Sequence, residues 1–475
     1  MWIYTQQKKA PSHLDPVTSG SLIIISRISL SKLLDFSPGK RKNKWDTLTN
    51  QRLLITKITE GMILLGKLSK DFWLFGSFFY LYYFIWAVCT TFFSLWLTNK
   101  MGLTSTEAGI VFSAVAIAAM CFQPFFGIIS DKLGFKKNLM WVFIALLVFI
   151  APFFIYIFPF LLQSNIFLGA IIGGAYLGAC FNGGCGAIEA YIEKVSRVKS
   201  FEYGQVRMFG SLGAATAVFI TGRLFSTDPN LLYWISSLAA VVLAIVFALT
   251  KITNNNEMKK TEIQEATSKK SILETFKNRK FWFLIIYVVG VGCIYEVFDQ
   301  QFPVYFTQFF SSPSEGAGVF GNLLTIQTFM EACVMIIAPF FIIKIGAKNA
   351  LIYCGCIMSI RIIGSGFADD AVVIILLKLM HALEVPILLV AIFKYINEHF
   401  NAELSATIYL IAFQFSKQIG ATFLSAIAGN MYDTVGFKDA YLLLGFIALF
   451  FTIISVFTLS GSSRIRKNPS ITETA

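Results

Sequence analysis

The stretch IILLKLMHALEVPILLV, residues 374–390, places three ionisable side chains in a run that is otherwise compatible with lipid. At ~100° per residue on a helix, Lys378, His381 and Glu384 fall within an arc of about 120°, so one face presents all three. Pro386 removes a backbone N–H near Glu384 and is expected to loosen the helix there. Because ionisable groups at membrane depth are costly, the stretch is predicted to be a membrane span that relays protons, with structural ion pairs as the alternative.

The composition indicates a polytopic membrane protein. Of the 475 residues, 56% are hydrophobic, 16% are aromatic and only 14% are charged, which is far from the composition of a soluble globular chain. Apolar segments long enough to cross ~30 Å of hydrocarbon recur between residues 72 and 460, so the predicted fold is all-α with twelve transmembrane helices. These helices are expected to begin near Trp73, Thr106, Leu139, Ile166, Gly204, Leu231, Phe281, Phe320, Ala350, Ala371, Ser405 and Ala440.

The net charge of +12 is concentrated in alternate loops, which argues against a nucleic-acid partner. One set of loops includes the basic segment 251–280, whereas the other set holds only Lys100, Arg223 and Lys438. The positive-inside rule therefore predicts that both termini and the central loop are cytoplasmic. The eight cysteines lie in apolar segments without the spacing of metal ligands, so no metal site is predicted.

A duplication divides the chain. The segment PFFGIISDKLGFKKN, residues 124–138, recurs with a short deletion as PFFIIKIGAKN, residues 339–349. This repeat predicts two homologous six-helix halves related by an axis along the membrane normal, which is the major facilitator architecture. The predicted parts are an N-terminal extension and cytoplasmic lead (1–71, with Met62 as an alternative start), the first half (72–250), a central cytoplasmic loop (251–280), the second half (281–460) and a cytoplasmic tail (461–475).

The loop after the second predicted span supports that architecture. Gly127, Asp131, Lys132, Gly134 and Lys136, followed by another lysine, resemble the superfamily signature G-x-x-x-D-K/R-x-G-x-K/R-K/R. A glycine permits close helix approach, and an aspartate can sit at a neighbouring helix N-terminus. An ordinary basic cytoplasmic loop is the alternative interpretation.

Several charged residues fall inside predicted spans. Glu189 and Arg207 flank a polar turn near Arg197, and they lie about 12 and 15 Å up two antiparallel helices at 1.5 Å per residue. An acid and a guanidinium at matching depth can pair, or can offer acceptors and donors to a polyhydroxylated ligand. Glu296 and Asp299 are three residues apart, so they share one helix face.

The intramembrane acids outnumber the fixed cations by one. An unpaired buried carboxylate prefers to take a proton. Glu384, with His381 one turn away, is the predicted carrier of one exchangeable proton. The acids are Glu189, Glu296, Asp299, Glu331 and Glu384, and the cations are Arg207, Arg361, Lys378 and Lys417.

Six motifs resemble the lactose permease family, the oligosaccharide:proton symporter branch of the major facilitator superfamily: CFNGGCGAIEAYIEKVSR, FEYGQVRMFG, YEVFDQQF, MSIRIIGS, KLMHALEVP and FQFSKQ. The resemblance runs from about residue 72 to residue 460. It implies that Glu189 and Arg207 bind sugar, with Asn182 nearby. It also implies that Arg361, His381, Glu384 and Tyr295 couple the proton, and that Asp299 pairs with Lys378 and Glu296 with Lys417.

Three positions depart from lactose permease. The expected aromatic platform is Ala214, the expected acid of the eighth span is Thr328, with Glu331 one turn further on, and Trp86 stands where that permease has a methionine. The choices at Trp86 and Glu331 look like the sucrose permease. We therefore expect Trp86 to supply the flat apolar face and Glu331 to join the substrate-binding residues.

The expected function is proton-coupled uptake of a disaccharide or small oligosaccharide, of the sucrose, lactose, raffinose or melibiose class, by alternating access. The resemblance places the protein in a bacterial inner membrane, embedded in the lipid bilayer and acting as a monomer. No cofactor other than the coupling proton is expected. The chain lacks the G-x-S-x-G, H-E-x-x-H and phosphate-loop patterns, so no enzyme is predicted. The alternative is a proton-coupled transporter of a different small polar or drug-like solute.

Overall fold

The computed structural model describes residues 69–133, 135–199, 201, 203–250, 275–400 and 408–461. The expectations for residues 1–68, for most of the central loop and for the tail after residue 461 lie outside the described residues. The same holds for Gly134 of the signature and for the side chains of Asp131 and Lys132. The part that is described is almost entirely helical.

The first half of the chain forms six successive helical segments, several of which contain π-helical turns. They are α3 (Lys70–Thr91) with α4 (Phe93–Leu95) and η1 (Trp96–Lys100); α5 (Ser105–Leu133); α6 (Asn138–Val148) with α7 (Ile150–Pro152), η2 (Phe153–Ile157) and α8 (Phe158–Ser164); α9 (Ile166–Leu177) with η3 (Gly178–Gly183) and α10 (Gly184–Lys199); α11 (Tyr203–Thr227); and α12 (Asn230–Leu249).

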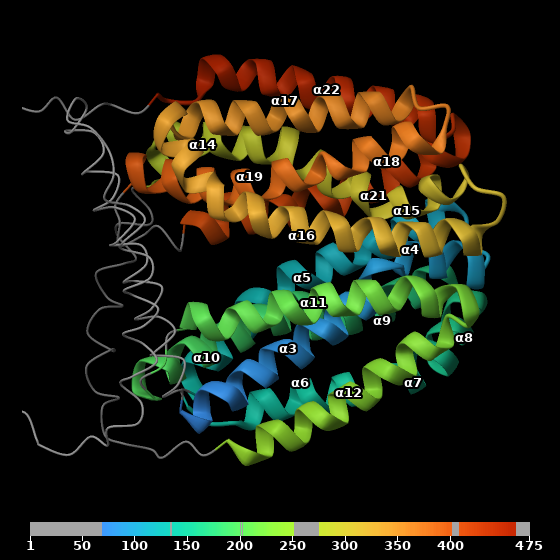
Figure 1. Ribbon diagram of the computed structural model, residues 1–475, viewed down its shortest axis with the longest axis vertical. Coiled ribbons are helices and arrows are strands. Elements are labelled where there is room, and N and C mark those ends of the chain that lie inside the picture. The colour runs from blue at the N-terminus through green and yellow to red at the C-terminus, as the bar shows by residue number, and fades with distance from the viewer. Residues whose placement is uncertain are drawn as a thin grey trace, which may run out of the picture. The chain divides into compact units, whose positions relative to one another are not determined.

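The second half follows the same plan. Its segments are α14 (Arg279–Tyr287) with η5 (Val288–Cys293) and α15 (Ile294–Thr307); α16 (Pro313–Ile345); α17 (Ala347–Gly366); α18 (Ala371–Leu379) with α19 (His381–His399); η7 (Tyr409–Phe415) with α21 (Ser416–Thr434); and α22 (Phe437–Thr458). Figure 1 shows the blue to green helices of the first half and the yellow to red helices of the second half as two groups.

Each predicted span corresponds to one of these segments. In the described ranges, ten helices are long and apolar enough to cross a membrane, and the bent pair Asn138–Val148 and Ile150–Ser164 raises the number to eleven. The remaining segment joins η7 to α21, and it is less apolar because it carries Lys417 and Asp433. The chain is therefore an all-α polytopic membrane protein.

Local chemistry explains where α16 begins and ends. The helix begins at Pro313, earlier than the predicted Phe320, because the Ser312 hydroxyl accepts a hydrogen bond from the Glu315 N–H at 3.2 Å and proline suits the first helical position. It ends at Gly346, where φ is 86°, a conformation that glycine adopts without strain.

The helix around Pro386 differs from the expectation. α19 runs through Pro386, and the interruption lies at Met380, between Lys378 and His381. The Met380 N–H is shared by the carbonyls of Leu376 and Leu377, at 3.3 and 3.2 Å, which tightens the turn there. The irregular turn of the helix is thus about one turn before Glu384 rather than beside it.

The two halves touch where α11 meets α16 and where α5 meets α21. Gly222 and Gly321 face each other so closely that a Cβ added to Gly222 would lie 2.7 Å from the Gly321 Cα. In the second contact, Gly109 packs on the Ser425 backbone and Gly429 on the Ser105 backbone. These helices meet backbone to backbone, which only glycine permits at such spacing.

Hydrogen bonds reinforce the second contact at the first turn of α5. The Asp433 carboxylate accepts bonds from the Ser105 N–H at 3.0 Å and from the Thr106 N–H and hydroxyl, both at 2.6 Å. The Gln301 amide donates to the Ser105 carbonyl at 2.9 Å. A carboxylate from the second half therefore caps a helix of the first half.

Candidate functional site

The first group of charges lies between α10 and α11. Arg207 Nε lies 2.7 Å from Glu189 Oε1, and about a third of each side chain is exposed. The antiparallel hairpin brings the two residues together, as the depth argument requires. The pair can bind each other and still reach a ligand.

Tyr83 of α3 contacts both members of this pair, and Trp86 of the same helix contacts Tyr83. The Tyr83 hydroxyl donates to Glu189 Oε1 at 2.6 Å, and the guanidinium of Arg207 lies 4.1 Å from the centre of the Tyr83 ring. Trp86 is one turn further along α3, 36% exposed, with its ring 6.2 Å from that of Tyr83 in an edge-to-face arrangement. The sequence argument included Trp86 and missed Tyr83, although the two are three residues apart on one helix face.

Asn182 is not part of the polar pair. It lies in η3, half-buried, and makes no hydrogen bond among the described residues. Asn182 lies inside the π-helical segment that precedes α10, and a π-helical turn changes the phase of a helix, so spacing alone could not settle the relation of Asn182 to Glu189. Ala214, in α11, is half-buried.

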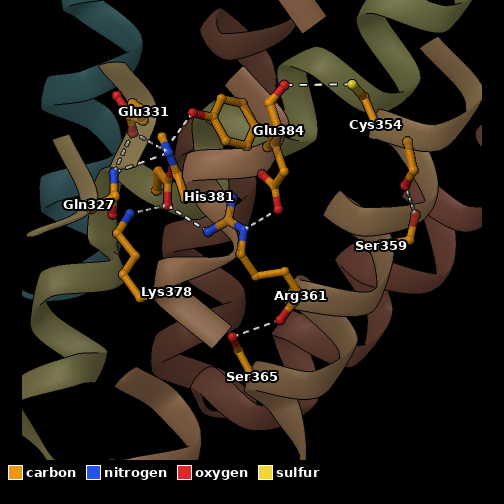
Figure 2. Close-up of polar contacts among 12 residues, drawn as sticks. Gln327, Glu331, Cys354, Ser359, Arg361, Ser365, Lys378, His381 and Glu384 are labelled. Atoms are coloured by element: carbon orange, nitrogen blue, oxygen red, sulfur yellow. Dashed lines mark hydrogen bonds and ion pairs between the residues drawn. The ribbon is translucent and has the colours of Figure 1, made fainter. Parts of the chain in front are cut away.

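The second group of charges is centred on Asp299 of α15. Its Oδ1 lies 3.0 Å from Lys378 Nζ and 3.2 Å from Arg361 Nη1, and its Oδ2 lies 3.0 Å from His381 Nε2. Figure 2 shows Lys378, Arg361 and His381 converging from three helical segments. One carboxylate thus holds two fixed cations and one histidine.

Arg361 also binds Glu384. Arg361 Nε lies 2.8 Å from Glu384 Oε1, and both side chains are fully buried. The Tyr295 hydroxyl lies 2.6 Å from His381 Nε2, so Tyr295 joins the same cluster. All four predicted proton-coupling residues are therefore in one connected network. Figure 2 labels three of them, Arg361, His381 and Glu384.

Glu331 closes the network on the other side of the imidazole. Its Oε1 lies 3.0 Å from His381 Nδ1 and accepts a hydrogen bond from the Gln327 amide at 2.8 Å. A quarter of the Glu331 side chain is exposed. Thr328, by contrast, donates its hydroxyl to the Leu324 carbonyl at 2.8 Å within its own helix.

The remaining ion pair is separate. Lys417 Nζ lies 2.8 Å from Glu296 Oε2, and both side chains are partly exposed. Glu296 and Asp299 share a helix but bind different cations. The geometry contains both pairs implied by the family resemblance.

The structure corrects the charge count in one respect. Among the described intramembrane acids, the one without a fixed cation is Glu331, not Glu384, because Arg361 pairs with Glu384. The sequence argument chose Glu384 because His381 is one turn away along the chain. In space the imidazole turns toward Asp299 and Glu331 instead.

One proton would neutralise this cluster. Asp299, Glu331 and Glu384 carry three negative charges against two on Arg361 and Lys378, with a histidine in the middle. Buried charges are stable only when they are balanced and hydrogen-bonded. One added proton would therefore balance the charges of this site, and the partly exposed first group of charges would remain accessible to a polar ligand.

Helical spans in two groups, with ion pairs packed between helices inside the membrane, are typical of polytopic membrane transporters. The chain belongs to the LacY proton/sugar symporter family, whose profile matches residues 65–470. It is accordingly a proton-coupled sugar transporter with the twelve-helix major facilitator fold.

The chain aligns with several curated relatives over most of their length. The chain is 49% identical to the melibiose permease of Enterobacter cloacae subsp. cloacae, over 84% of this chain and 95% of the relative. It is 47% identical to the raffinose permease of Escherichia coli, over 85% and 96%, and 35% identical to the sucrose permease of the same species, over 81% and 92%. The solved structure of the nucleoside transporter NupG shares the fold, with a TM-score of 0.70 at 14% identity over 82% of this chain and all of that one.

Proposed function

We propose that the transported sugar is a disaccharide or small oligosaccharide of the melibiose, raffinose, lactose or sucrose class, bound between Trp86 and the Glu189–Arg207 pair. The observation that carries this proposal is the partial exposure of that ion pair beside an exposed indole ring. An indole offers a flat apolar face to a sugar ring, and the pair offers charged acceptors and donors to its hydroxyls. Asn182, which makes no hydrogen bond in the described part of the chain, has its amide available.

We further propose that Glu384 carries the transported proton, although Glu331 and not Glu384 is the acid without a fixed cation among the described residues. Its Oε2 has no hydrogen-bond partner among the described residues, so a proton can be added there. Arg361 would then keep Asp299, which is 3.2 Å from its Nη1. Protonation of Glu384 would thus leave the Arg361 guanidinium paired with Asp299 alone, and no buried cation would lose all of its carboxylate partners.

We also propose that Glu331 links the sugar site to the proton site. This carboxylate is partly exposed and binds His381, whose other ring nitrogen faces Asp299. A sugar hydroxyl that binds Glu331 would draw it away from the imidazole and change the charge balance around Arg361. We propose this exchange as the link between sugar binding and proton release.

The proposed orientation has both termini in the cytoplasm of a bacterial inner membrane, and the transporter acts as a monomer. The end where Asp433 caps α5 would then face outward. In this orientation the structure is closed toward the outside by the contacts between the two halves. Alternating access would open that end as the other closes.

Uptake into membrane vesicles tests the proposal. Vesicles that contain the wild-type protein, with an imposed pH gradient, should accumulate at least one of labelled melibiose, raffinose, lactose and sucrose. Glu189→Gln and Arg207→Lys should abolish uptake while the protein stays inserted, because each keeps its size but loses the bidentate polar geometry. Near-normal transport by either variant would rule out this sugar site.

A further inference from the structure

We propose that Tyr83 is a positioning residue of the sugar site, which holds the Glu189 carboxylate and the Arg207 guanidinium in the arrangement that a sugar recognises. The inference rests on the proposed sugar site and extends it to a residue that contacts both charged partners.

Tyr83 lies behind the ion pair. Its side chain is 7% exposed, whereas about a third of Glu189 and of Arg207 is accessible. The hydroxyl is 2.6 Å from Glu189 Oε1 and 3.0 Å from the Cys185 sulfur. The ring lies under the guanidinium at 4.1 Å. A ligand that approaches the exposed side therefore meets the pair first, with Tyr83 as its support.

The hydrogen bonds within this group occupy only some of the polar atoms of Glu189 and Arg207. Glu189 Oε1 accepts from both the Tyr83 hydroxyl and Arg207 Nε. In the part of the chain that the structure describes, Glu189 Oε2 and the terminal guanidinium nitrogens make no hydrogen bond, so they are available to a ligand. An O–H···O⁻ bond of this length is charge-assisted and strong, so it restricts rotation of the carboxyl group.

The aromatic ring restricts the cation in turn. A guanidinium that stacks on an aromatic face gains a cation–π interaction and keeps its plane parallel to the ring. The same ring contacts Trp86 edge to face at 6.2 Å. Tyr83 therefore fixes the polar pair and the proposed apolar platform relative to one another.

This arrangement reduces the cost of binding. A flexible carboxylate and a flexible arginine would each lose conformational freedom when a sugar binds, and preorganisation removes that loss from the binding step. It also sharpens selection among sugars, because fixed donors and acceptors match one arrangement of hydroxyl groups better than another. Tyr83 should thus affect affinity and discrimination more than the speed of transport.

The test compares two tyrosines on the same helix. Tyr83→Phe removes the hydroxyl and keeps the ring. Tyr80→Phe is the matched control, because the Tyr80 hydroxyl also bonds to a neighbouring helix: it meets the Thr216 hydroxyl of α11 at 2.9 Å, whereas the Tyr83 hydroxyl meets Glu189 of α10. Equilibrium binding of melibiose, raffinose, lactose and sucrose is measured on the purified proteins. Downhill exchange in vesicles gives KM and Vmax, and thermal unfolding gives Tm.

We expect Tyr83→Phe to raise the Kd of the best-bound sugar about tenfold, equivalent to ~1.4 kcal/mol, and to narrow the ratio of Kd values between sugars. KM should rise while Vmax is retained. Tyr80→Phe should change Kd less than about twofold by comparison, since it removes a bond between neutral groups away from the ion pair. Cys185→Ala should resemble the Tyr80 control, since a thiol is a weak partner.

A Kd for Tyr83→Phe that matches that of Tyr80→Phe would overturn the inference and leave the proposed function intact. A lower Tm with unchanged Kd would do the same, because Tyr83 would then be a packing residue. If the wild-type protein binds none of the four sugars, the proposed function fails and the inference fails with it.

Discussion

Asp299→Asn is expected to lower the free energy of unfolding by about 3–5 kcal/mol, the usual cost of removing one partner of a buried ion pair. Of the three residues that bind Asp299, two also bind a second carboxylate and one does not. Arg361 would keep Glu384 at 2.8 Å, and His381 would keep Glu331 at 3.0 Å. Lys378, which is 4% exposed, has no other carboxylate within ion-pair distance among the described residues.

Removing the stranded cation should restore stability. Asp299→Asn combined with Lys378→Met replaces the pair by neutral groups of similar size, and such replacements are often close to neutral in stability. We expect the double variant to recover more than half of the loss. Glu296→Gln is the comparison, because the side chain of the cation that it leaves behind, Lys417, is 18% exposed against 5% for that of Lys378, so we expect a smaller loss of stability than for Asp299→Asn.

Unfolding of the detergent-purified proteins can be followed with a thiol-reactive dye, because Cys89, Cys293 and Cys354 are buried in the folded state. The reasoning is refuted if Asp299→Asn is no less stable than Glu296→Gln. It is also refuted if the double variant is as unstable as Asp299→Asn alone, because the loss would then come from packing and not from the unpaired cation.

Two further substitutions test the proposed sugar and proton sites. Trp86→Ala should weaken sugar binding on the order of fivefold, or ~1 kcal/mol of lost ring contact, and by more than Ala214→Trp alters it; an unchanged Kd would reduce Trp86 to core packing. Glu384→Gln mimics the protonated carboxyl group, so exchange of labelled sugar across vesicles should continue while accumulation driven by a pH gradient is lost. If Glu384→Gln still accumulates sugar, Glu331 becomes the first candidate for the proton, and Glu331→Gln is the next variant to measure.

Contacts between helices that are consecutive in the chain could be predicted from the sequence. Glu189 and Arg207 could be paired because a short turn joins their helices, so depth along each helix was enough. The twelve spans followed from hydrophobic length, which depends on the thickness of the bilayer and not on tertiary contacts. Both arguments need only local geometry.

The arrangement around Asp299 could not be derived in the same way. Its partners come from α17, α18 and α19, and the relative rotation of those helices is set by packing. The pairing of Arg361 with Glu384 could not be derived from spacing along the chain. The surplus acid was therefore assigned to Glu384, whereas Glu331 is the acid without a fixed cation among the described residues. Tyr83 was missed because α3 is aromatic on every side, and an apolar stripe does not show which ring faces a carboxylate.

The glycine contacts between the halves have a consequence for the energy economy of the cell. Where Gly222 meets Gly321 and Gly109 meets Ser425, no flexible side chain lies between the helices. A change of side-chain rotamer therefore cannot open these contacts between the two halves in part. They are either made or broken by movement of whole helices. We therefore expect these residues, which bind neither sugar nor proton in the proposed sites, to limit a leak of protons that would dissipate the gradient without moving sugar. We expect a single methyl group added at one of these glycines to increase proton leak before it slows sugar uptake.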